Sequence, residues 1–240
     1  VEFDWGADPF QARQIVSEKL QLVSATLPGE VEAPVLAPIS SIMGEILFAA
    51  MTSDRHTPME VRTAADFTLR RRVLAVPGVS QVIVTGGERR QFEVVLQPER
   101  LIAYGLTVDH VLRALGDTNL SVSAGFLTEG GQEYLVHGAG RVLVPQDVAE
   151  TLVALRGDEP ILVRNLGEVR IGAALKRGEG SFRASPAVVV GIQKQPGVNT
   201  LELTERLERE LDDIQRTLPS GMRIQRNIFR QADFIRLAVS

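Results

Sequence analysis

Cysteine is absent from the 240-residue chain, aromatic residues make up only 5% of it, and histidine occurs three times. Without cysteine there can be neither a disulfide nor a thiolate metal site, which fits an oxidising compartment and simple disuse equally well. His56, His110 and His137 are far apart and show no metal-ligand spacing, so solvent-exposed histidines are the simpler interpretation. There is no signal peptide and no apolar run of 18 residues, so this segment is not expected to span a membrane.

Catalytic patterns are also lacking. The sequence contains no G-x-S-x-G elbow, and Gly86-Gly87 is typical of a turn rather than of a phosphate-binding loop. The acidic residues of 205–213 fit the solvent face of a helix, so we do not expect an enzyme. The net charge is −4 and the basic run Arg70–Arg72 is short, so the charge pattern does not favour nucleic acid as a partner.

The two ends of the chain carry similar patterns. A helix is predicted over 9–26, with Asp8 as its cap, between strands at 1–3 and near Val31. A second helix is predicted over 199–218, and its cap, apolar face and Leu-Pro ending match the first at an offset of 191 residues. We interpret this match as an internal repeat of strand–helix–strand units, although any two amphipathic helices share some of these features.

A third unit of this kind follows a Pro-containing linker at 35–41. A strand is predicted over 45–51, a helix over 58–76 that begins with a Thr57/Glu60 capping box, and a strand over 79–85. Two strand–helix–strand units that share one sheet, with both helices on one face, form the ferredoxin-like arrangement. The predicted fold class is therefore α+β, with ferredoxin-like βαβ subdomains.

Residues 91–183 differ in composition and pattern, since they are rich in glycine and in short predicted strands, which indicates an inserted α+β subdomain. We predict a helix from Leu106 with four residues facing inward, a hairpin around Gly130-Gly131, a helix from Pro145 to Leu152 and a strand over 161–171. The inward residues are Val108, Val111, Leu112 and Leu115. The strand 187–192 then returns to the first architecture.

Glu45 is the one carboxylate that interrupts an otherwise apolar strand, within Ser41–Phe48. A glutamate at the solvent edge of the strand is the simpler explanation. A lone carboxylate among apolar residues is also a place where a hard or borderline cation is held with ligands from elsewhere. The four methionines do not cluster, and Met43 and Met51 suit core packing.

Several motifs together resemble the first large periplasmic loop of the resistance-nodulation-division efflux pumps, in their heavy-metal subclass. The motifs, in chain order, are Phe3–Asp8 before Ala12-Arg13, Leu27-Pro28, Pro38–Ser41 with Gly44–Ile46, Pro77–Val79, Gly86-Gly87 with Arg90-Gln91, Leu101–Thr107, Asn119, Gly130–Tyr134 and Gly197–Thr200. Each is weak alone, but they cover nearly the whole chain in the family's order.

The resemblance implies a division into subdomains. Residues 1–35 would be part of the first porter subdomain, and 45–90 with 185–228 the two halves of the second. Residues 91–183 would be the docking subdomain, with the hairpin as its arm to a neighbouring protomer. Residues 229–240 would lead into a transmembrane helix, so we expect a larger parent protein.

Function follows as a further implication. The parent would be a trimeric, proton-driven exporter of metal cations (zinc, cobalt and cadmium, or copper and silver) on the periplasmic side of the bacterial inner membrane. It would work with a periplasmic adaptor and an outer-membrane channel, with no resident cofactor. In some zinc-type members a glutamate at the position of Glu45 contributes to a metal site, together with acidic residues of the second periplasmic loop. Two alternatives remain open: an exporter of organic amphiphiles from the same superfamily, and a stand-alone ferredoxin-like binding module.

Overall fold

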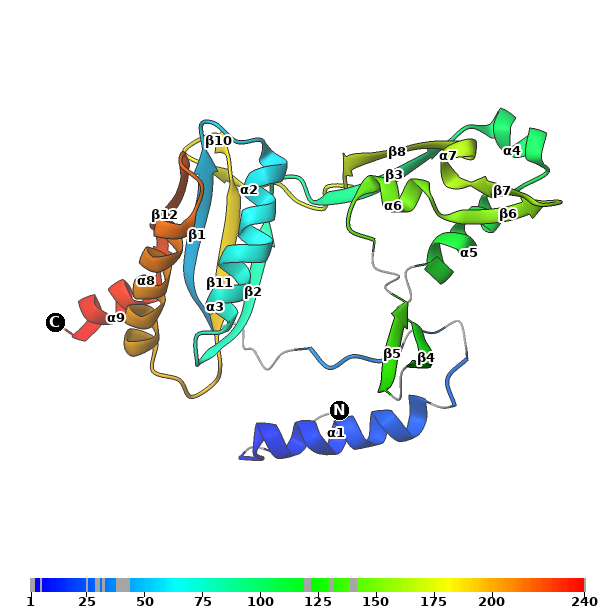
Figure 1. Cartoon of the computed structure of the whole chain (residues 1–240). Coiled ribbons are helices and arrows are strands. Elements are labelled where there is room, and N and C mark those ends of the chain that lie inside the picture. Colours follow the sequence, from blue (N-terminus) through cyan, green and yellow to red (C-terminus); the bar gives the residue numbers. More distant parts are fainter. Residues whose placement is uncertain are drawn as a thin grey trace.

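The computed structural model describes residues 3–4, 6–24, 26–28, 31, 33–37, 44–118, 122–129, 132–138 and 142–239, and of 118, 122–129 and 132–138 only the backbone. Figure 1 shows a sheet layered with helices, a second α+β unit beside it, a hairpin and a separate N-terminal helix. The predicted strand at 1–3 and the hairpin tip at 130–131 lie largely outside the described residues.

The main sheet has four antiparallel strands in the order β12-β1-β11-β2. They are β1 (Glu45–Ser53), β2 (Val79–Thr85), β11 (Val188–Lys194) and β12 (Met222–Arg230). Each half of the sheet is a strand–helix–strand unit, so this order is the ferredoxin-like one and confirms the predicted α+β class.

Helices cover one face of this sheet. The first is a continuous rod of α2 (Pro58–Ala64), the π-helical turn η2 (Ala65–Leu69) and α3 (Arg70–Leu74), and the second is α8 (Thr200–Thr217). The predicted Thr57/Glu60 capping box and the Asn199 cap are both present. Apolar side chains of the two helices and of the sheet form the core, in which Leu203, Leu207, Leu211 and Ile214 of α8 are fully buried.

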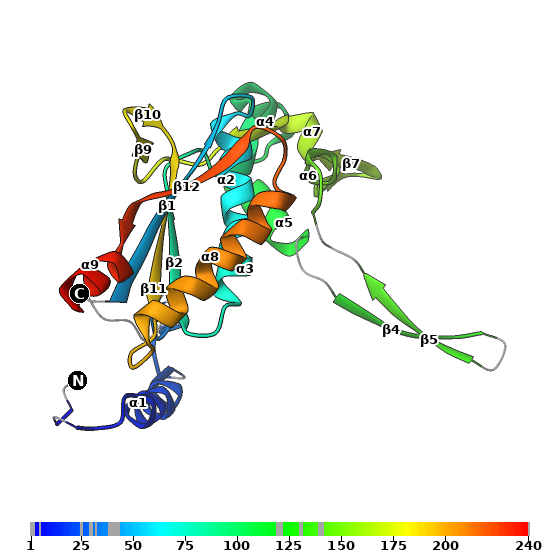
Figure 2. The same ribbon diagram turned by 90° about the vertical axis from the view of Figure 1, so that its left-hand side faces the viewer.

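We call the opposite face of the sheet the open face, because no long helix of the described chain covers it (Figure 2). Figure 2 shows α8 and α3 on one side of the sheet, and on the other side α9 (Gln231–Val239) and the short pair β9 (Ser181–Phe182) and β10 (Ser185–Pro186). The short helix α9 lies near one end of the open face, beside β1 and β12.

The chain passes to the second unit at Gly86-Gly87, both of which have positive φ. The turn does not close a hairpin: β2 stays in the main sheet, and β3 (Arg90–Leu96) pairs with β8 (Gly167–Ala173) instead. The remaining elements of this unit are α4 (Pro98–Tyr104), α5 (Val108–Thr118), α6 (Pro145–Ala149), β6 (Leu152–Arg156), β7 (Glu159–Leu162) and α7 (Val163–Leu166). Its own small core contains Leu101, Val111 and Leu166.

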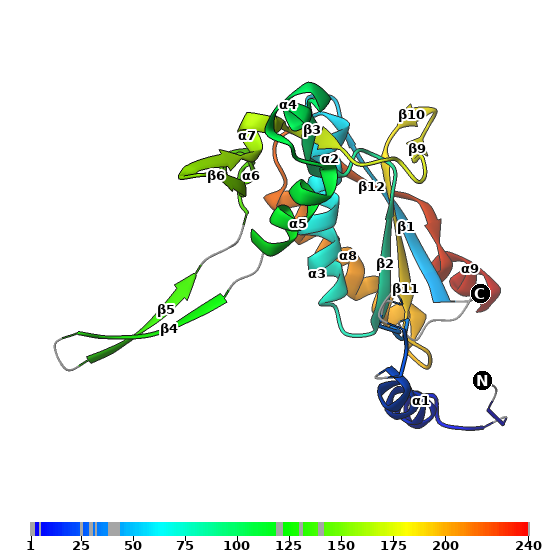
Figure 3. The ribbon, with the colours of Figure 1, turned by 90° about the vertical axis from the view of Figure 1, so that its right-hand side faces the viewer.

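Three details of the prediction for this unit are wrong. On α5, Val111 and Leu115 pack inward as expected, but Val108 and Leu112 are 51% and 60% exposed. The strand predicted over 161–171 is broken by the helical turn α7, and Leu152 begins β6 rather than ending α6. The predicted hairpin is present as β4 (Val122–Glu129) paired with β5 (Gln132–Gly138), and Figure 3 shows it projecting away from the rest.

The N-terminal helix α1 (Pro9–Ser24) begins as predicted, because Asp8 Oδ1 accepts hydrogen bonds from the backbone amides of Phe10 and Gln11. None of its side chains is buried. The strand predicted near Val31 is wrong for the described residues there, since 31 and 33–37 form no regular structure. Arg13 instead holds this segment against α1 through the carbonyls of Leu36 and Ala37, at 3.0 and 2.6 Å. The match at an offset of 191 residues thus holds for the helices and their caps, and the described residues around α1 form neither of the two flanking strands.

Candidate functional site

Glu45 is the first residue of β1, an interior strand between β11 and β12. It is half-buried, so the simple picture of a glutamate at a fully exposed edge is incomplete. The register of β1 against β11 shifts between Glu45 and Leu47, and the two residues that follow Glu45, Ile46 and Leu47, both enter the core. A bulge of this kind re-aims the side chains next to it.

Glu45 lies directly opposite Gln193 of β11, which in turn lies opposite Gln81 of β2. Glu45, Gln193 and Gln81 thus form a polar row across three strands. Gly191, two residues before Gln193, shows which face of the sheet carries this row. Gly191 is opposite Phe48, and a Cβ at Gly191 would come within 2.9 Å of the Phe48 ring. Since neighbouring Val190 and Ile192 belong to the core, Gly191 and Gln193 face the open side of the sheet.

Aromatic side chains flank this polar row. Phe48 and Phe229 meet edge to face with ring centroids 5.7 Å apart, and Phe229 and Phe234 of α9 are 5.9 Å apart. The end of the open face near α9 therefore combines a carboxylate and two amides with an apolar wall.

Two side-chain oxygens in the described chain are buried without a hydrogen-bond partner, Oε1 of Gln193 and Oε1 of Gln231. Gln231 is the first residue of α9 and follows Arg230, which is opposite Leu47. Both oxygens thus belong to residues that flank the beginning of β1. The sequence gives no signal for either, because their position depends on strand pairing.

Among the described residues, Glu45 does not belong to a ready-made group of metal ligands. Within the described ranges, no three His, Cys, Asp or Glu side chains come together as a metal-binding group. Met51 and Met222 are buried in the core, and Met43 lies outside the described residues. His56 bonds Ser53 at 2.9 Å and His110 caps its own helix at Thr107, which fits structural roles, while only the backbone of His137 is described.

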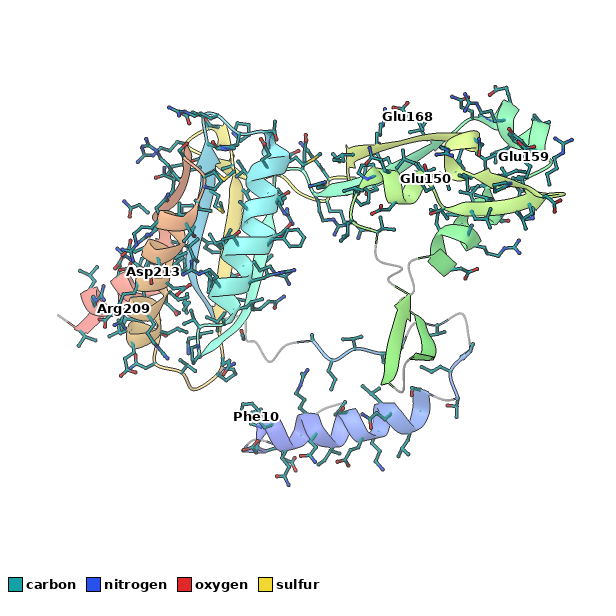
Figure 4. All side chains as sticks on the ribbon, in the orientation of Figure 1. Phe10, Glu150, Glu159, Glu168, Arg209 and Asp213 are labelled. Carbon is teal, nitrogen blue, oxygen red and sulfur yellow. The ribbon has the colours of Figure 1, made fainter. Side chains whose placement is uncertain are left out.

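The acidic residues of α8 form ion pairs rather than a catalytic cluster. Glu208 pairs with Arg230, Asp212 with Arg226 at 2.7 Å, and Glu210 with Arg72 at 2.6 Å. Hydrogen bonds to Asp233 and Glu208 raise the pKa of the Arg230 guanidinium further above its ordinary value. Figure 4 shows Arg209 and Asp213 on the side of α8 turned away from the sheet, as the predicted solvent face requires.

A cavity of about 470 Å³ lies where the main sheet meets the second unit. Its lining includes four cationic side chains, Arg62, Arg89, Lys176 and Arg177. Lys176 pairs with Glu179 at 3.3 Å, and Arg62 donates to the Gly86 carbonyl at 2.6 Å. Arg62 also pairs with Asp66 at 2.8 Å, but the cavity lining contains no carboxylate that could bind a metal ion, so the open face near Glu45 is the better candidate.

The family model for the AcrB/AcrD/AcrF family matches residues 1–240. The chain belongs to the AcrB/AcrD/AcrF family. Among its relatives is the cobalt-zinc-cadmium resistance protein CzcA of Cupriavidus metallidurans, 31% identical over 233 residues, with 93% of this chain and 22% of CzcA covered. The nickel and cobalt resistance protein CnrA of the same organism is 29% identical, with 92% and 24% covered.

The cation efflux system protein CusA of Escherichia coli is 28% identical, with 93% of this chain and 22% of CusA covered. The chain thus spans under a quarter of the length of these family members. A crystal structure of a heavy metal efflux pump has the same fold, with a TM-score of 0.82 and 23% identity over 99% of this chain and 23% of the pump. These matches confirm the resemblance inferred from the motifs. None of the described helices is both long and apolar enough to cross a membrane.

Proposed function

We propose that this chain is the periplasmic porter and docking portion of a proton-driven pump that exports divalent heavy-metal cations. The observation that carries the proposal is the nature of its relatives: CzcA and CnrA are named as metal resistance proteins and CusA as a cation efflux protein, and each match covers more than nine-tenths of this chain. The proposed subdomains are those predicted above, with 45–90 and 185–228 building the ferredoxin-like porter unit.

Glu45 is proposed as a ligand for the transported cation. The half-buried carboxylate stands at the end of the open face and, in the described chain, takes part in no ion pair. An uncompensated carboxylate attracts a divalent cation, and it is the side chain type that hard and borderline ions bind. The cation is the cargo of the pump, with zinc as the first ion to test.

The whole assembly is proposed by the same reasoning. The parent pump would be a homotrimer on the periplasmic side of the inner membrane, joined by an adaptor protein to an outer-membrane channel. The hairpin β4–β5, which projects from the second unit in Figure 3, has a suitable shape for the arm between protomers.

The direct experiment measures the growth of a metal-sensitive bacterial host that carries the full-length pump. Wild-type pump should raise tolerance to zinc and cobalt, Glu45→Ala should remove most of that gain, and Glu45→Asp should keep part of it. Glu168→Ala is the matched control, because Glu168 is an exposed glutamate on β8 (Figure 4). Unchanged zinc and cobalt tolerance in Glu45→Ala would remove Glu45 from the site. In vesicles, collapse of the pH gradient should stop transport.

A second candidate, an exporter of organic amphiphiles, is favoured by one observation. Phe48, Phe229 and Phe234 form a contiguous aromatic group on the open face, which suits an apolar ligand. The same host decides between the two: a pump for amphiphiles raises tolerance to dyes and detergents and leaves metal tolerance at the level of the empty vector.

A further inference from the structure

We propose that Gln193 and Gln231 supply amide oxygens that bind the transported cation together with the Glu45 carboxylate, at the end of the open face. This inference rests on the proposed function and adds ligands to it. It starts from the two buried side-chain oxygens that have no partner in the described chain, both beside the first residues of β1.

Gln193 is placed by strand pairing. Side chains directly opposite each other on antiparallel strands have Cβ atoms about 5 Å apart, so the Glu45 carboxylate and the Gln193 amide reach a common ion above the sheet. The amide oxygen is buried, and no donor of the described protein bonds it. A buried acceptor without a partner is unfavourable, and a bound ion or water is its usual explanation.

Gln231 approaches from the other side of β1. The guanidinium of Arg230, at the end of β12, pairs with Glu208 of α8 and with Asp233 of α9, and Gln231 follows Arg230 as the first residue of α9. The helix α9 lies at this end of the sheet, where it contacts β1 and also α8, through Arg236 and Glu205 at 3.7 Å. Since Arg230 lies opposite Leu47, two residues from Glu45, the second buried oxygen flanks the same strand end.

Among the described residues, Glu45 forms no ion pair, and the cations next in sequence to the two glutamines have other partners. The guanidinium of Arg230 is engaged by Glu208 and Asp233, and the ammonium of Lys194 donates to the carbonyl of Val198 at 3.0 Å. The three proposed ligands, one carboxylate and two amides, all bind through oxygen and carry a total charge of −1. Such a set repels anions and attracts a cation.

The donor types select the class of cation. Carboxylate and amide oxygens suit hard or borderline divalent ions, whereas copper(I) and silver(I) prefer sulfur ligands. With one charged ligand the site is weak, as a transport site must be if the ion is to leave it. The remaining coordination positions would be filled by water or by other parts of the parent pump.

The test uses the full-length pump in proteoliposomes and measures the initial rate of Zn²⁺ transport against Zn²⁺ concentration. Gln193→Leu and Gln231→Leu keep the volume of the side chain and remove the oxygen, and each should raise the half-saturating Zn²⁺ concentration about tenfold or more. Gln225→Leu is the matched control, because Gln225 is a partly buried glutamine opposite Ala50, further along the sheet, and should leave the concentration dependence unchanged.

Stability provides an independent readout. In metal-free protein, Gln193→Leu should raise the unfolding temperature, since it removes a buried unpaired oxygen, and added Zn²⁺ should stabilise this variant less than wild type. A Gln193→Leu variant that is more stable without metal and binds Zn²⁺ more weakly would support Gln193 as a ligand. Loss of a glutamine with a purely structural role would not raise stability and lower Zn²⁺ affinity together.

If Gln193→Leu does not fold, Gln193→Glu tests the inference in its place. This variant keeps a side-chain oxygen and adds a negative charge, so it should lower both the half-saturating Zn²⁺ concentration and the maximal rate of transport. The inference would be overturned if Gln193→Leu and Gln231→Leu, or Gln193→Glu, showed the same dependence on Zn²⁺ concentration as wild type. The two amide oxygens would then be hydrogen-bonded to bound water. Failure of the wild-type pump to move any divalent cation would instead overturn the proposed function.

Discussion

Arg72 of α3 donates a hydrogen bond from Nε to Oε1 of Glu210 on α8 at 2.6 Å, and this ion pair links the two helices that cover the main sheet. The residues are 138 positions apart in sequence. The side chains are 35% and 25% exposed, so solvent screens the pair and its stabilisation is modest. Within the arginine run 70–72, Arg70 is also engaged, since its Nε donates to the Val82 carbonyl at 3.2 Å.

Removing one member of this pair should reduce stability slightly. Arg72→Ala and Glu210→Ala should each lower the free energy of unfolding by about 0.5–1 kcal/mol in urea titrations at low salt, and by less at high salt. The double variant should cost less than the sum of the two. Strict additivity in this double-mutant cycle would mean that the two side chains do not interact.

The cap of α2 should make stability depend on pH. Glu60 accepts a hydrogen bond from the backbone amide of Thr57 at 2.8 Å, which lowers the pKa of Glu60 below its ordinary value of 4.5. Because the pKa is lower in the folded protein, the stabilisation is complete above about pH 4.5 and is lost as the pH falls through the folded pKa.

Glu60→Gln should therefore flatten the decrease in stability below pH 4.5, as measured by thermal unfolding across pH 3–6. At neutral pH, Thr57→Ala should cost about 1 kcal/mol through loss of the helix cap. The bonds of Asp147 to the backbone amides of Leu143 and Val144 lower the pKa of Asp147 in the same way, so Asp147→Asn offers a comparison at another helix. Identical acid profiles for wild type and Glu60→Gln would contradict the prediction.

The sequence predicted local structure well wherever a single helix or strand carries its own signals. Caps such as Thr57 and Asn199, and the apolar period of α8, depend on neighbouring residues and were visible in advance. Val108 and Leu112 were misplaced because the helix α5 meets its core through a narrower stripe than its apolar residues suggest. Which side of such a helix is covered depends on the rest of the fold.

The candidate site was predictable only in part. Glu45 is visible as a carboxylate within an apolar strand, but pairing of β1 with β11 brings Gln193 opposite it from 148 residues along the chain, and pairing with β12 brings the start of α9 to the same strand end. Pairing between distant strands leaves no local mark in one sequence. The same reason applies at Gly86-Gly87: the sequence predicts a turn there and a subdomain boundary at 90/91, but the partners of the strands on either side, β11 and β8, depend on distant pairing.

Gly86 should tolerate no side chain. Its φ is +84°, and a Cβ there would lie 2.6 Å from both the Ala187 carbonyl oxygen and the Gly180 nitrogen. Gly86→Ala should destabilise the protein by at least about 3 kcal/mol, because backbone strain and collision add together. Gly105 is the control, since its φ is +66° but the space around it is open, so Gly105→Ala should cost only about 1 kcal/mol. Equal losses in urea unfolding would show that the collision is relieved.

Two leucines test the assignment of the core in a similar way. Leu207 of α8 is fully buried against the main sheet, whereas Leu112 of α5 is 60% exposed despite its place in an amphipathic pattern. Leu207→Ala should lower the free energy of unfolding by about 2–5 kcal/mol, because it removes buried methyl groups and leaves a cavity. Leu112→Ala should change it by less than about 0.5 kcal/mol. A loss of several kcal/mol in Leu112→Ala would mean that this face of α5 is covered in the folded protein, as the apolar pattern first suggested.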